Sequence, residues 1–467
     1  MMNKLRRFFL LFLCAVIFNA GIFSVESKSK EKRDSKPDYS DVEVVKLDNN
    51  IPVYIKNIRD SNVSSVSIVV RGGVLYLEPE LSGLELALFT MMCRGSKLYS
   101  YEEIQNFEYR TLGGVSCNSG RYGSVLTMNC LNKYFDETLN LFVDAFMAPS
   151  FGPKEYDLLI QDYNQNVQHM LNEPSSMLFY YANQMVYDGH PYGVSYSVTP
   201  DSIKNITIAE LKKLHKQVLD SRRISIVATG AFNKKELVKK LNAQLGKIPF
   251  GDYELKEQEI PSVKIKGNPV VLSHPNARGT GYILRLFNSP TIHSEDYPVC
   301  RLVESIYSNI LYNVVREKNG ICYTPSSFVS SSDAPYGGEY LYRVSNLTDF
   351  KSAIKEAQDI MISGKTISSR DKNGNYIFED LSSRLSGYKN TYINQKYSSQ
   401  ASVSGVNSRM CAGLLQFDDI DASQKLTEKV KKVSVDDILR VFKKYWLTDD
   451  YQWFAVVSPE DEGNLKF

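Results

Sequence analysis

The chain lacks an excess of charge of either sign, and it contains few histidines and tryptophans. Its 467 residues carry a formal net charge of +2, with five His and two Trp. Nothing in this balance indicates binding to nucleic acid or to an anionic membrane surface. With 43% hydrophobic and 23% charged residues, the composition is that of a globular protein, and the length favours more than one domain.

A long hydrophobic run is lacking except near the N-terminus. There the basic stretch MMNKLRR precedes the apolar run FFLLFLCAVIFNAGIF, and small residues follow it. The run is shorter than the ~20 residues of a membrane-spanning helix, so a cleaved signal peptide over residues 1–27 is favoured over a permanent anchor. Cys14 leaves a lipoprotein as a minor alternative. We expect an exported protein, periplasmic or associated with the cell envelope, that needs no membrane association after cleavage.

Closely spaced cysteines are also lacking, because the chain has no CxxC pair. Most of the cysteines that follow the leader stand in apolar contexts, where buried thiols are expected and no disulfide can be assigned. They are Cys93, Cys117, Cys130, Cys300, Cys322 and Cys411.

Strand and helix patterns occur twice in the same order, which indicates an α+β protein of two duplicated domains. In each, helices are expected on one face of a mostly antiparallel sheet. The segments after RTLGG and after REKNG both read as strands followed by a helix, which suggests an internal duplication of about 210 residues. The expected organisation is a polar tether over 28–41, an N-terminal domain over 42–250, a linker over 251–266 and a C-terminal domain over 267–467.

The first helix of the N-terminal domain is expected over GLELALFTMMCR. Its residues are apolar nearly all round, so it is expected to be buried. Ser82 precedes it as the expected N-cap, and Gly95 follows at its C-terminal end.

Several motifs follow one another in an order that resembles a known family. They are RGG, SGLELALFTMMCRGS, LGG, FGPKEYD, NEP, HPYG and IVATGAF, followed in the second half by VVREKNGICYTPSS. Together they resemble the pitrilysin/insulinase family of zinc peptidases. The best match is to its short two-domain members, similar to mitochondrial processing peptidase and to the core subunits of the cytochrome bc1 complex. The resemblance covers roughly residues 42–460.

Active members of this family bind zinc through a His-x-x-Glu-His helix motif and a glutamate about 76 residues later, and the Glu of the motif activates the zinc-bound water. Here the resemblance places Leu86 and Thr90 at the histidines, Phe89 at the catalytic glutamate and Asn166 at the distal ligand. None of the four side chains suits zinc, and the first histidine of the chain comes only at position 169. We therefore expect no metal in this chain, and zinc only in a partner chain.

The histidines that do occur have structural interpretations. His190 belongs to the HPYG turn, and His169 and His215 lie on amphipathic helices, where surface or interface positions are expected. The other two, in loops, are His274 and His293.

The second half keeps a pair that the resemblance assigns to substrate binding. In active relatives an Arg and a Tyr seven residues apart hold the substrate backbone and stabilise the tetrahedral intermediate; Arg316 and Tyr323 have this spacing in REKNGICY. The alternative is that Arg316 caps its helix and Tyr323 is an ordinary sheet residue.

The resemblance favours a non-catalytic subunit of an exported heterodimeric metallopeptidase. It would lend Arg316, Tyr323 and chamber walls to a zinc-bearing partner of the same family that acts on peptides or unfolded polypeptides. The alternative is a peptide-binding or scaffold protein without a peptidase role, in which the strand around Val115 to Ser119 takes an extended peptide. An active peptidase with a non-standard site is a third possibility.

Overall fold

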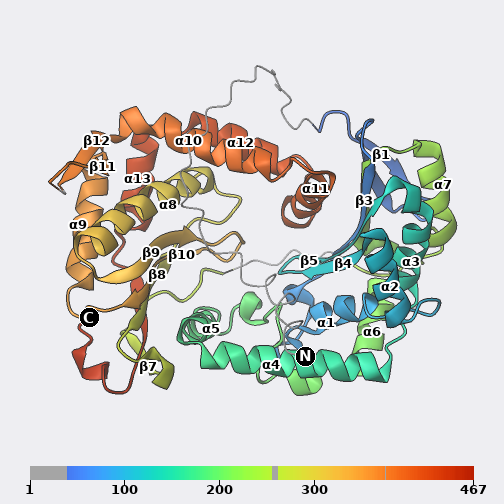
Figure 1. Cartoon of the computed structure of the whole chain (residues 1–467), viewed down its shortest axis with the longest axis horizontal. Helices are drawn as coiled ribbons and strands as arrows, with labels where there is room; N and C mark the ends of the chain where they lie inside the picture. Colours follow the sequence, from blue (N-terminus) through green and yellow to red (C-terminus); the bar gives the residue numbers. More distant parts are fainter. Residues whose placement is uncertain (1–38, 255–260, 374) are drawn as a thin grey trace. The chain divides into compact units, whose positions relative to one another are not determined.

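The computed structural model describes residues 39–254, 261–373 and 375–467 (Figure 1). The predicted signal peptide and most of the predicted tether lie outside the described residues. At the end of the tether, Tyr39 is buried, and its hydroxyl donates to the side chain of Gln400. Among the described residues, no helix is long and apolar enough to cross a membrane.

The N-terminal half is built on a six-stranded sheet with strand order β1-β2-β6-β3-β5-β4. Every neighbouring pair is antiparallel except β2 and β6, which are parallel. The strands are β1 (Glu43–Lys46), β2 (Pro52–Asn57), β3 (Val63–Arg71), β4 (Gly114–Ser119), β5 (Gly123–Leu131) and β6 (Ile224–Gly230).

Side chains of β3 alternate between two faces, as a strand requires. Val66, Ile68 and Val70 join the main core of this half, and Val69 faces the other side. The main core lies between the sheet and the helices α1 (Leu84–Met92), α2 (Tyr101–Thr111), α3 (Phe135–Met147), α4 (Pro153–Asn172), α6 (Ile208–Val218) and α7 (Lys234–Leu245).

The C-terminal half repeats this topology with a five-stranded sheet of order β7-β13-β8-β10-β9. Its last strand lies between the first two and is parallel to the first, as β6 is to β2. The last strand thus takes the equivalent place in both sheets, which supports the predicted duplication. The strands are β7 (Val270–Ser273), β8 (Gly281–Asn288), β9 (Cys322–Val329), β10 (Tyr336–Val344) and β13 (Tyr451–Val457).

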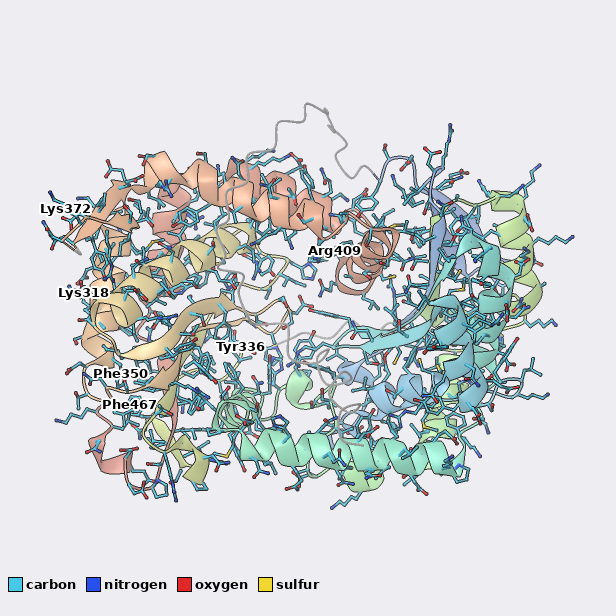
Figure 2. The ribbon with its side chains drawn as sticks, viewed as in Figure 1. Lys318, Tyr336, Phe350, Lys372, Arg409 and Phe467 are labelled. Atoms are coloured by element: carbon cyan, nitrogen blue, oxygen red, sulfur yellow. The ribbon has the colours of Figure 1, made fainter. Side chains whose placement is uncertain are left out.

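Most helices of the C-terminal half pack around α8, which is followed by a turn of π-helix over Tyr312–Lys318. The chain finishes against α9, with the rings of Phe467 and Phe350 5.8 Å apart (Figure 2). The helices are α8 (Tyr297–Leu311), α9 (Phe350–Ile362), α10 (Leu381–Ser398), α11 (Val403–Phe417), α12 (Ala422–Lys432) and α13 (Val435–Tyr445).

Each sheet is also contacted by a helix from the other half. Helix α5 (Pro174–Val186) packs on β13 and β8, and α11 packs on β3 and β6. Asn407 of α11 is buried there; its amide donates to the carbonyls of Ser65 and Val227 at 3.2 and 3.1 Å. Its Oδ1 accepts from the Ser67 hydroxyl at 2.5 Å. The two halves are therefore joined by buried polar and apolar contacts.

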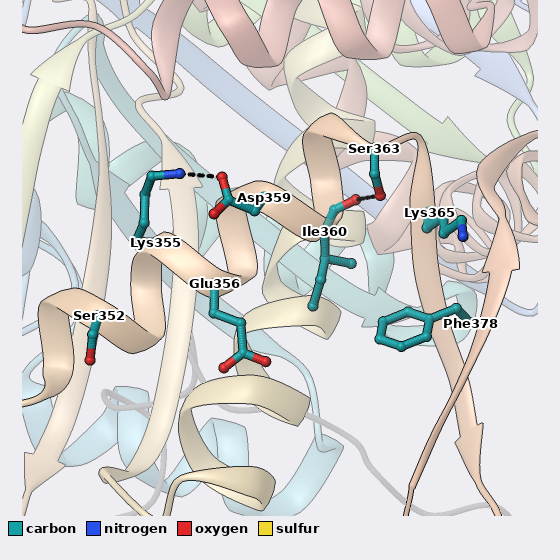
Figure 3. A pocket seen from close by; sticks show the side chains of 8 residues that line it. All are labelled: Ser352, Lys355, Glu356, Asp359, Ile360, Ser363, Lys365 and Phe378. Carbon is teal, nitrogen blue, oxygen red and sulfur yellow. Dashed lines mark hydrogen bonds and ion pairs between the residues drawn. The ribbon is translucent and has the colours of Figure 1, made fainter.

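A small hairpin of β11 (Lys365–Arg370) and β12 (Tyr376–Asp380) stands apart from both large sheets. An open, shallow groove lies between this hairpin and α9 (Figure 3). Lys355 and Asp359 form an ion pair along its wall, and Phe378 lies at its other side. The groove offers no constellation of chemical groups that suggests catalysis.

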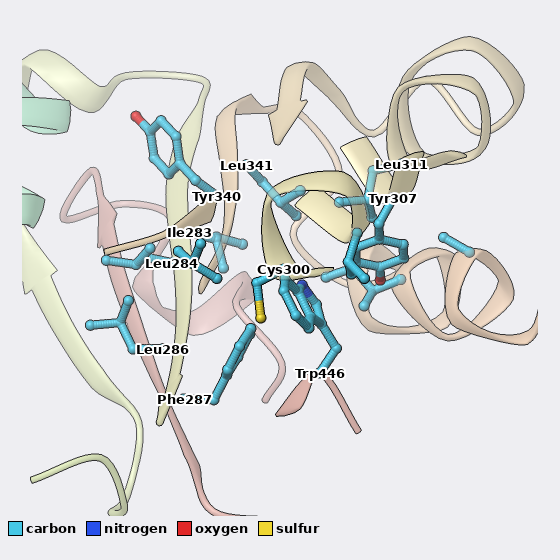
Figure 4. Packing of buried hydrophobic residues seen from close by; sticks show 14 of the residues in the cluster. Ile283, Leu284, Leu286, Phe287, Cys300, Tyr307, Leu311, Tyr340, Leu341 and Trp446 are labelled. Carbon is cyan, nitrogen blue, oxygen red and sulfur yellow. The ribbon is translucent and has the colours of Figure 1, made fainter. Parts of the chain in front are cut away.

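The core of the C-terminal half is rich in aromatic side chains (Figure 4). Trp446 is fully buried, with its ring centroid 5.3 Å from that of Phe287, and its indole nitrogen donates to the Ser327 hydroxyl at 2.7 Å. The buried carboxylate of Glu339 lies 3.4 Å from Arg285. The hydrogen bond to Ser327 satisfies the buried indole N–H of Trp446, whereas Glu339 Oε2 has no hydrogen-bond partner among the described residues.

The predicted N-cap of α1 is wrong. Ser82 is instead hydrogen-bonded to the Pro79 carbonyl and to the Ser195 amide, at 2.8 and 3.0 Å. The cap position belongs to Gly83, which has φ 80°. Glycine suits this left-handed conformation because it has no Cβ, and a Cβ at Gly83 would lie 2.4 Å from the Val198 nitrogen.

Candidate functional site

Helix α1 carries three of the positions at which the resemblance places zinc-site residues. Phe89 is fully buried in the N-terminal core, whereas Leu86 and Thr90 are half-buried. The Thr90 hydroxyl donates to the Leu86 carbonyl at 2.7 Å, within its own helix. This face of α1 thus presents an isobutyl group, a phenyl ring and a hydroxyl, none of which is a good zinc ligand.

The fourth position, Asn166, is exposed on α4. On the same helix, the buried Tyr163 lies close to Thr90. Burial raises the pKa of the Tyr163 phenol to about 12, and the nearby Thr90 hydroxyl opposes this rise. Tyr163 is one helical turn before Asn166, so counting along the sequence did not identify it.

Two thiols lie beside these residues, and sequence reasoning gave them no role in the site. Cys117 Sγ on β4 is 4.0 Å from Thr90 Oγ1, and Cys93 follows α1 directly. The Cys117 thiol and burial together raise the pKa of Cys93 well above its usual value. The six cysteines after residue 38 are free thiols, as expected, with Cys93 and Cys117 only half-buried.

Glu85 precedes the substituted positions but does not face them. Its carboxylate accepts from the Gly73 amide at 2.9 Å and from the Ser124 hydroxyl at 2.5 Å. Burial raises its pKa, and these two hydrogen bonds and the charge of Arg223 counteract the rise. Glu85 therefore joins α1 to the turn after β3 and to β5.

Three histidines use their rings to join backbone segments. His190 accepts from the Tyr192 amide at 3.0 Å and contacts the Pro261 carbonyl at 2.9 Å. His274 makes the same pattern with the Asn276 amide and the Leu171 carbonyl, both at 3.0 Å.

His215 is buried against the Phe146 carbonyl at 2.8 Å, so its predicted surface position is wrong. Its helix turns this ring into the core, where the carbonyl supplies the hydrogen bond that a buried imidazole needs. His169 is exposed, and His293 pairs with Asp333 at 3.1 Å. In the part of the chain that the structure describes, no three His, Cys, Asp or Glu side chains are grouped so that they could hold a metal ion.

The structure brings Arg316 and Tyr323 together. Arg316 lies in the π-helical turn and Tyr323 on β9; the guanidinium carbon is 4.8 Å from the Tyr323 ring centroid and 4.8 Å from that of Tyr312. Such cation–π contacts orient the guanidinium. Arg316 Nε also lies 3.3 Å from Glu317, and Tyr323 is 61% exposed. Both functional groups can therefore reach a ligand from solvent.

The strand proposed to take a peptide is at the edge of its sheet. β4 pairs with β5 on one side, and no described strand pairs with its other side. Cys117 and Asn118 stand on this strand, and Cys117 brings it next to Thr90. An unpaired strand edge is a template for an extended peptide.

Comparisons with known proteins agree with this architecture. A family model described as insulinase (peptidase family M16) matches residues 53–199, which include α1 and Asn166. A second, described as peptidase M16 inactive domain, matches residues 205–363, which include Arg316 and Tyr323. The chain belongs to the M16 peptidase family.

The similarity to one relative and to two solved structures extends over most of the chain. An uncharacterized zinc protease of Rickettsia felis is 19% identical over 434 residues, covering 90% of this chain and 98% of the relative. A protease from Helicobacter pylori has a TM-score of 0.75 at 16% identity, covering 89% of this chain and 99% of that one. A peptidase M16 inactive domain from Pseudomonas fluorescens has a TM-score of 0.75 at 15% identity, covering 90% and 98%. The chain therefore has the two-domain M16 fold.

Proposed function

We propose that this chain is the non-catalytic subunit of an exported heterodimeric M16 metallopeptidase. Its role is to supply Arg316, Tyr323 and the walls of a substrate chamber to a zinc-bearing partner of the same family. The observation that carries the proposal is the contrast between two sites. The zinc positions of α1 hold Leu86, Phe89 and Thr90, whereas Arg316 and Tyr323 face each other within 4.8 Å and are open to solvent.

The chemistry assigned to this pair is transition-state stabilisation. A guanidinium forks onto a peptide carbonyl or an oxyanion, and a phenol donates a second hydrogen bond to the same centre. The stacking of Arg316 between Tyr312 and Tyr323 holds the guanidinium in one orientation before a ligand arrives. The pair would act on substrate bound at the zinc ion of the partner.

The test is co-expression with an M16 protein of the same organism that carries an intact His-x-x-Glu-His motif. We expect the two chains to co-purify and to cleave unfolded peptides faster than the partner alone. Arg316→Ala should lower kcat/KM of the pair by about 10²-fold, the cost of removing one oxyanion donor. Arg278→Ala, which removes an exposed arginine of the same half, should leave the rate unchanged. Failure of the chains to associate, or no gain in rate, contradicts the proposal.

The open edge of β4 supports a second candidate, a peptide-binding protein without a peptidase role. In that case an extended peptide binds the isolated chain through main-chain hydrogen bonds. Fluorescence anisotropy of a labelled peptide with the isolated chain tests this. Saturable binding that Arg316→Ala leaves unchanged would favour the second candidate, and no binding to the isolated chain would reject it.

A further inference from the structure

Two thiols lie side by side at the point where α1 ends next to β4. Cys93 directly follows α1 and keeps a helical backbone conformation, so its side chain lies on the same face as that of Thr90, three positions earlier. Cys117 stands on β4, and its Sγ lies 4.0 Å from Thr90 Oγ1. The two cysteine side chains are hydrogen-bonded to each other. Packing of α1 on β4 thus joins two residues that are distant in the sequence.

This hydrogen bond makes the two thiols chemically unequal. With Cys93 as the donor and the Cys117 sulfur as the acceptor, it raises the pKa of Cys93 and lowers the pKa of Cys117. Burial opposes the lowering of the Cys117 pKa, whereas the Thr90 hydroxyl and the charge of Arg94 support it. The thiolate is the reactive form of cysteine, so Cys117 is the better nucleophile and Cys93 is a second thiol beside it.

The other cysteines of the described residues differ from this pair in burial and in acidity. Cys93 and Cys117 are half-buried, whereas the others lie in the protein core. Burial raises the pKa of each of these core thiols, which keeps it protonated and unreactive. They are Cys130, Cys300, Cys322 and Cys411. An oxidant that arrives from solvent is therefore expected to react at the pair first.

We propose that Cys93 and Cys117 form a reversible disulfide by exchange with a small-molecule or protein disulfide. The Cys117 thiolate attacks one sulfur of that disulfide, forms a mixed disulfide and releases the other sulfur as a thiolate. Cys93 then loses its proton and attacks Cys117 Sγ, so that the intramolecular S–S bond forms and the second thiolate leaves. The two thiols of the chain are oxidised, the external disulfide is reduced to two thiols, and the two protons pass to the released thiolates.

The disulfide would tie an edge strand to a helix. Among the described strands β4 pairs only with β5, and its other edge is the candidate peptide site described above. A covalent link from Cys117 to the end of α1 holds this edge in place, and reduction releases it. The proposal goes beyond the proposed function, because it needs neither the partner subunit nor the Arg316–Tyr323 pair. An oxidising compartment, which the proposed export implies, would favour the disulfide.

Peptide mapping of the folded full chain tests the proposal. The chain is equilibrated in glutathione buffers of increasing oxidised fraction, its free thiols are blocked with N-ethylmaleimide, and it is digested with trypsin without reductant. The disulfide should appear as one linked product of residues 72–94 and 111–121, and it should disappear when a reductant is added. Tm of the oxidised chain should lie several degrees above that of the reduced chain, because the bond restricts the unfolded chain.

Two single substitutions separate the roles of the thiols. Cys93→Ser keeps a hydrogen-bond donor beside Cys117 but lacks the second thiol, so the mixed disulfide with glutathione should accumulate at Cys117. Cys117→Ser lacks the better nucleophile and should acquire glutathione at Cys93 about tenfold more slowly or less. Cys130→Ala, which removes a buried thiol of the neighbouring strand β5, is the control and should give the linked product in the yield of the wild type.

Two results on the wild type would overturn the proposal: absence of the linked product in the most oxidising buffer, or its formation only in urea. Two results on the variants would do the same. One is attachment of glutathione to Cys93 of Cys117→Ser as fast as to Cys117 of Cys93→Ser. The other is a yield of the linked product from Cys130→Ala as low as from either serine variant.

Discussion

The side chains at the four positions where the resemblance places the zinc ligands and the catalytic glutamate differ in how deeply they are buried. Phe89 is fully buried, whereas Leu86 and Thr90 are half-buried and Asn166 is exposed. Only Phe89 therefore has become part of the packing of the N-terminal half. Placing metal ligands at positions 86, 90 and 166 should therefore disturb the core little, whereas Phe89→Glu would place a carboxylate inside the core.

Phe89→Glu should lower the free energy of unfolding by at least about 3 kcal/mol, because it removes a buried ring and buries a carboxylate among apolar groups. Leu86→His, at a half-buried position of the same helix, should cost less than about 1.5 kcal/mol. Urea denaturation followed by circular dichroism measures both. Equal stabilities of Phe89→Glu and the wild type would show that α1 is not packed as described.

At the scale of elements, the contact of α11 with β3 and β6 joins the halves through a polar side chain. Asn407 makes three hydrogen bonds there, with Ser65, Ser67 and Val227. Asn407→Ala should lower the free energy of unfolding by about 1–3 kcal/mol, the cost of leaving buried groups unsatisfied. Ser404→Ala, at an exposed position of α11, is the control. A loss as small as that of the control would argue against this packing.

The contact of Asp296 with α13 should contribute a stabilisation that depends on pH. Burial alone would raise the pKa of Asp296, but hydrogen bonds from Lys444, Arg440 and Tyr445 of α13 outweigh it and lower the pKa. The stabilisation is thus present above the pKa of an unfolded aspartate, about 3.9, and is lost as pH falls through the lower folded value. Tm of Asp296→Asn should lie below that of the wild type at pH 7, and the gap should narrow below about pH 4.

The control for this experiment is Asp449→Asn, which alters an exposed aspartate. Its Tm should follow that of the wild type throughout. A gap for Asp296→Asn that stays constant between neutral and acid pH would contradict the assignment of its stabilisation to the ionised carboxylate.

The sequence predicted those elements whose patterns are local. The α+β class, the strands after RTLGG (β4 and β5) and the burial of α1 follow from the alternation and helical periodicity of their own residues. The order β7-β13-β8 could not be predicted, because β13 pairs with strands far away in the sequence. The neighbour of Thr90 was missed for a similar reason, since spacing along α4 indicated Asn166 whereas packing brings Tyr163 there.

At the scale of the whole molecule, the two related halves differ in the candidate site residues that they contain. The N-terminal half has the fold, but its described residues form no group that could hold a metal ion, and the C-terminal half holds Arg316 and Tyr323 in contact. Our proposal rests on this contrast: the chain contributes to catalysis beside a partner that carries the metal.

Metal analysis of the purified full chain tests the central claim most directly. The chain is expressed with added zinc, dialysed against metal-free buffer without a strong chelator, and examined by mass spectrometry for bound metal and by a peptide-cleavage assay. The account predicts far less than one zinc per chain and no cleavage by the chain alone, because its α1 face has no imidazole or carboxylate ligand. One zinc per chain, together with cleavage that a chelator abolishes, would contradict it.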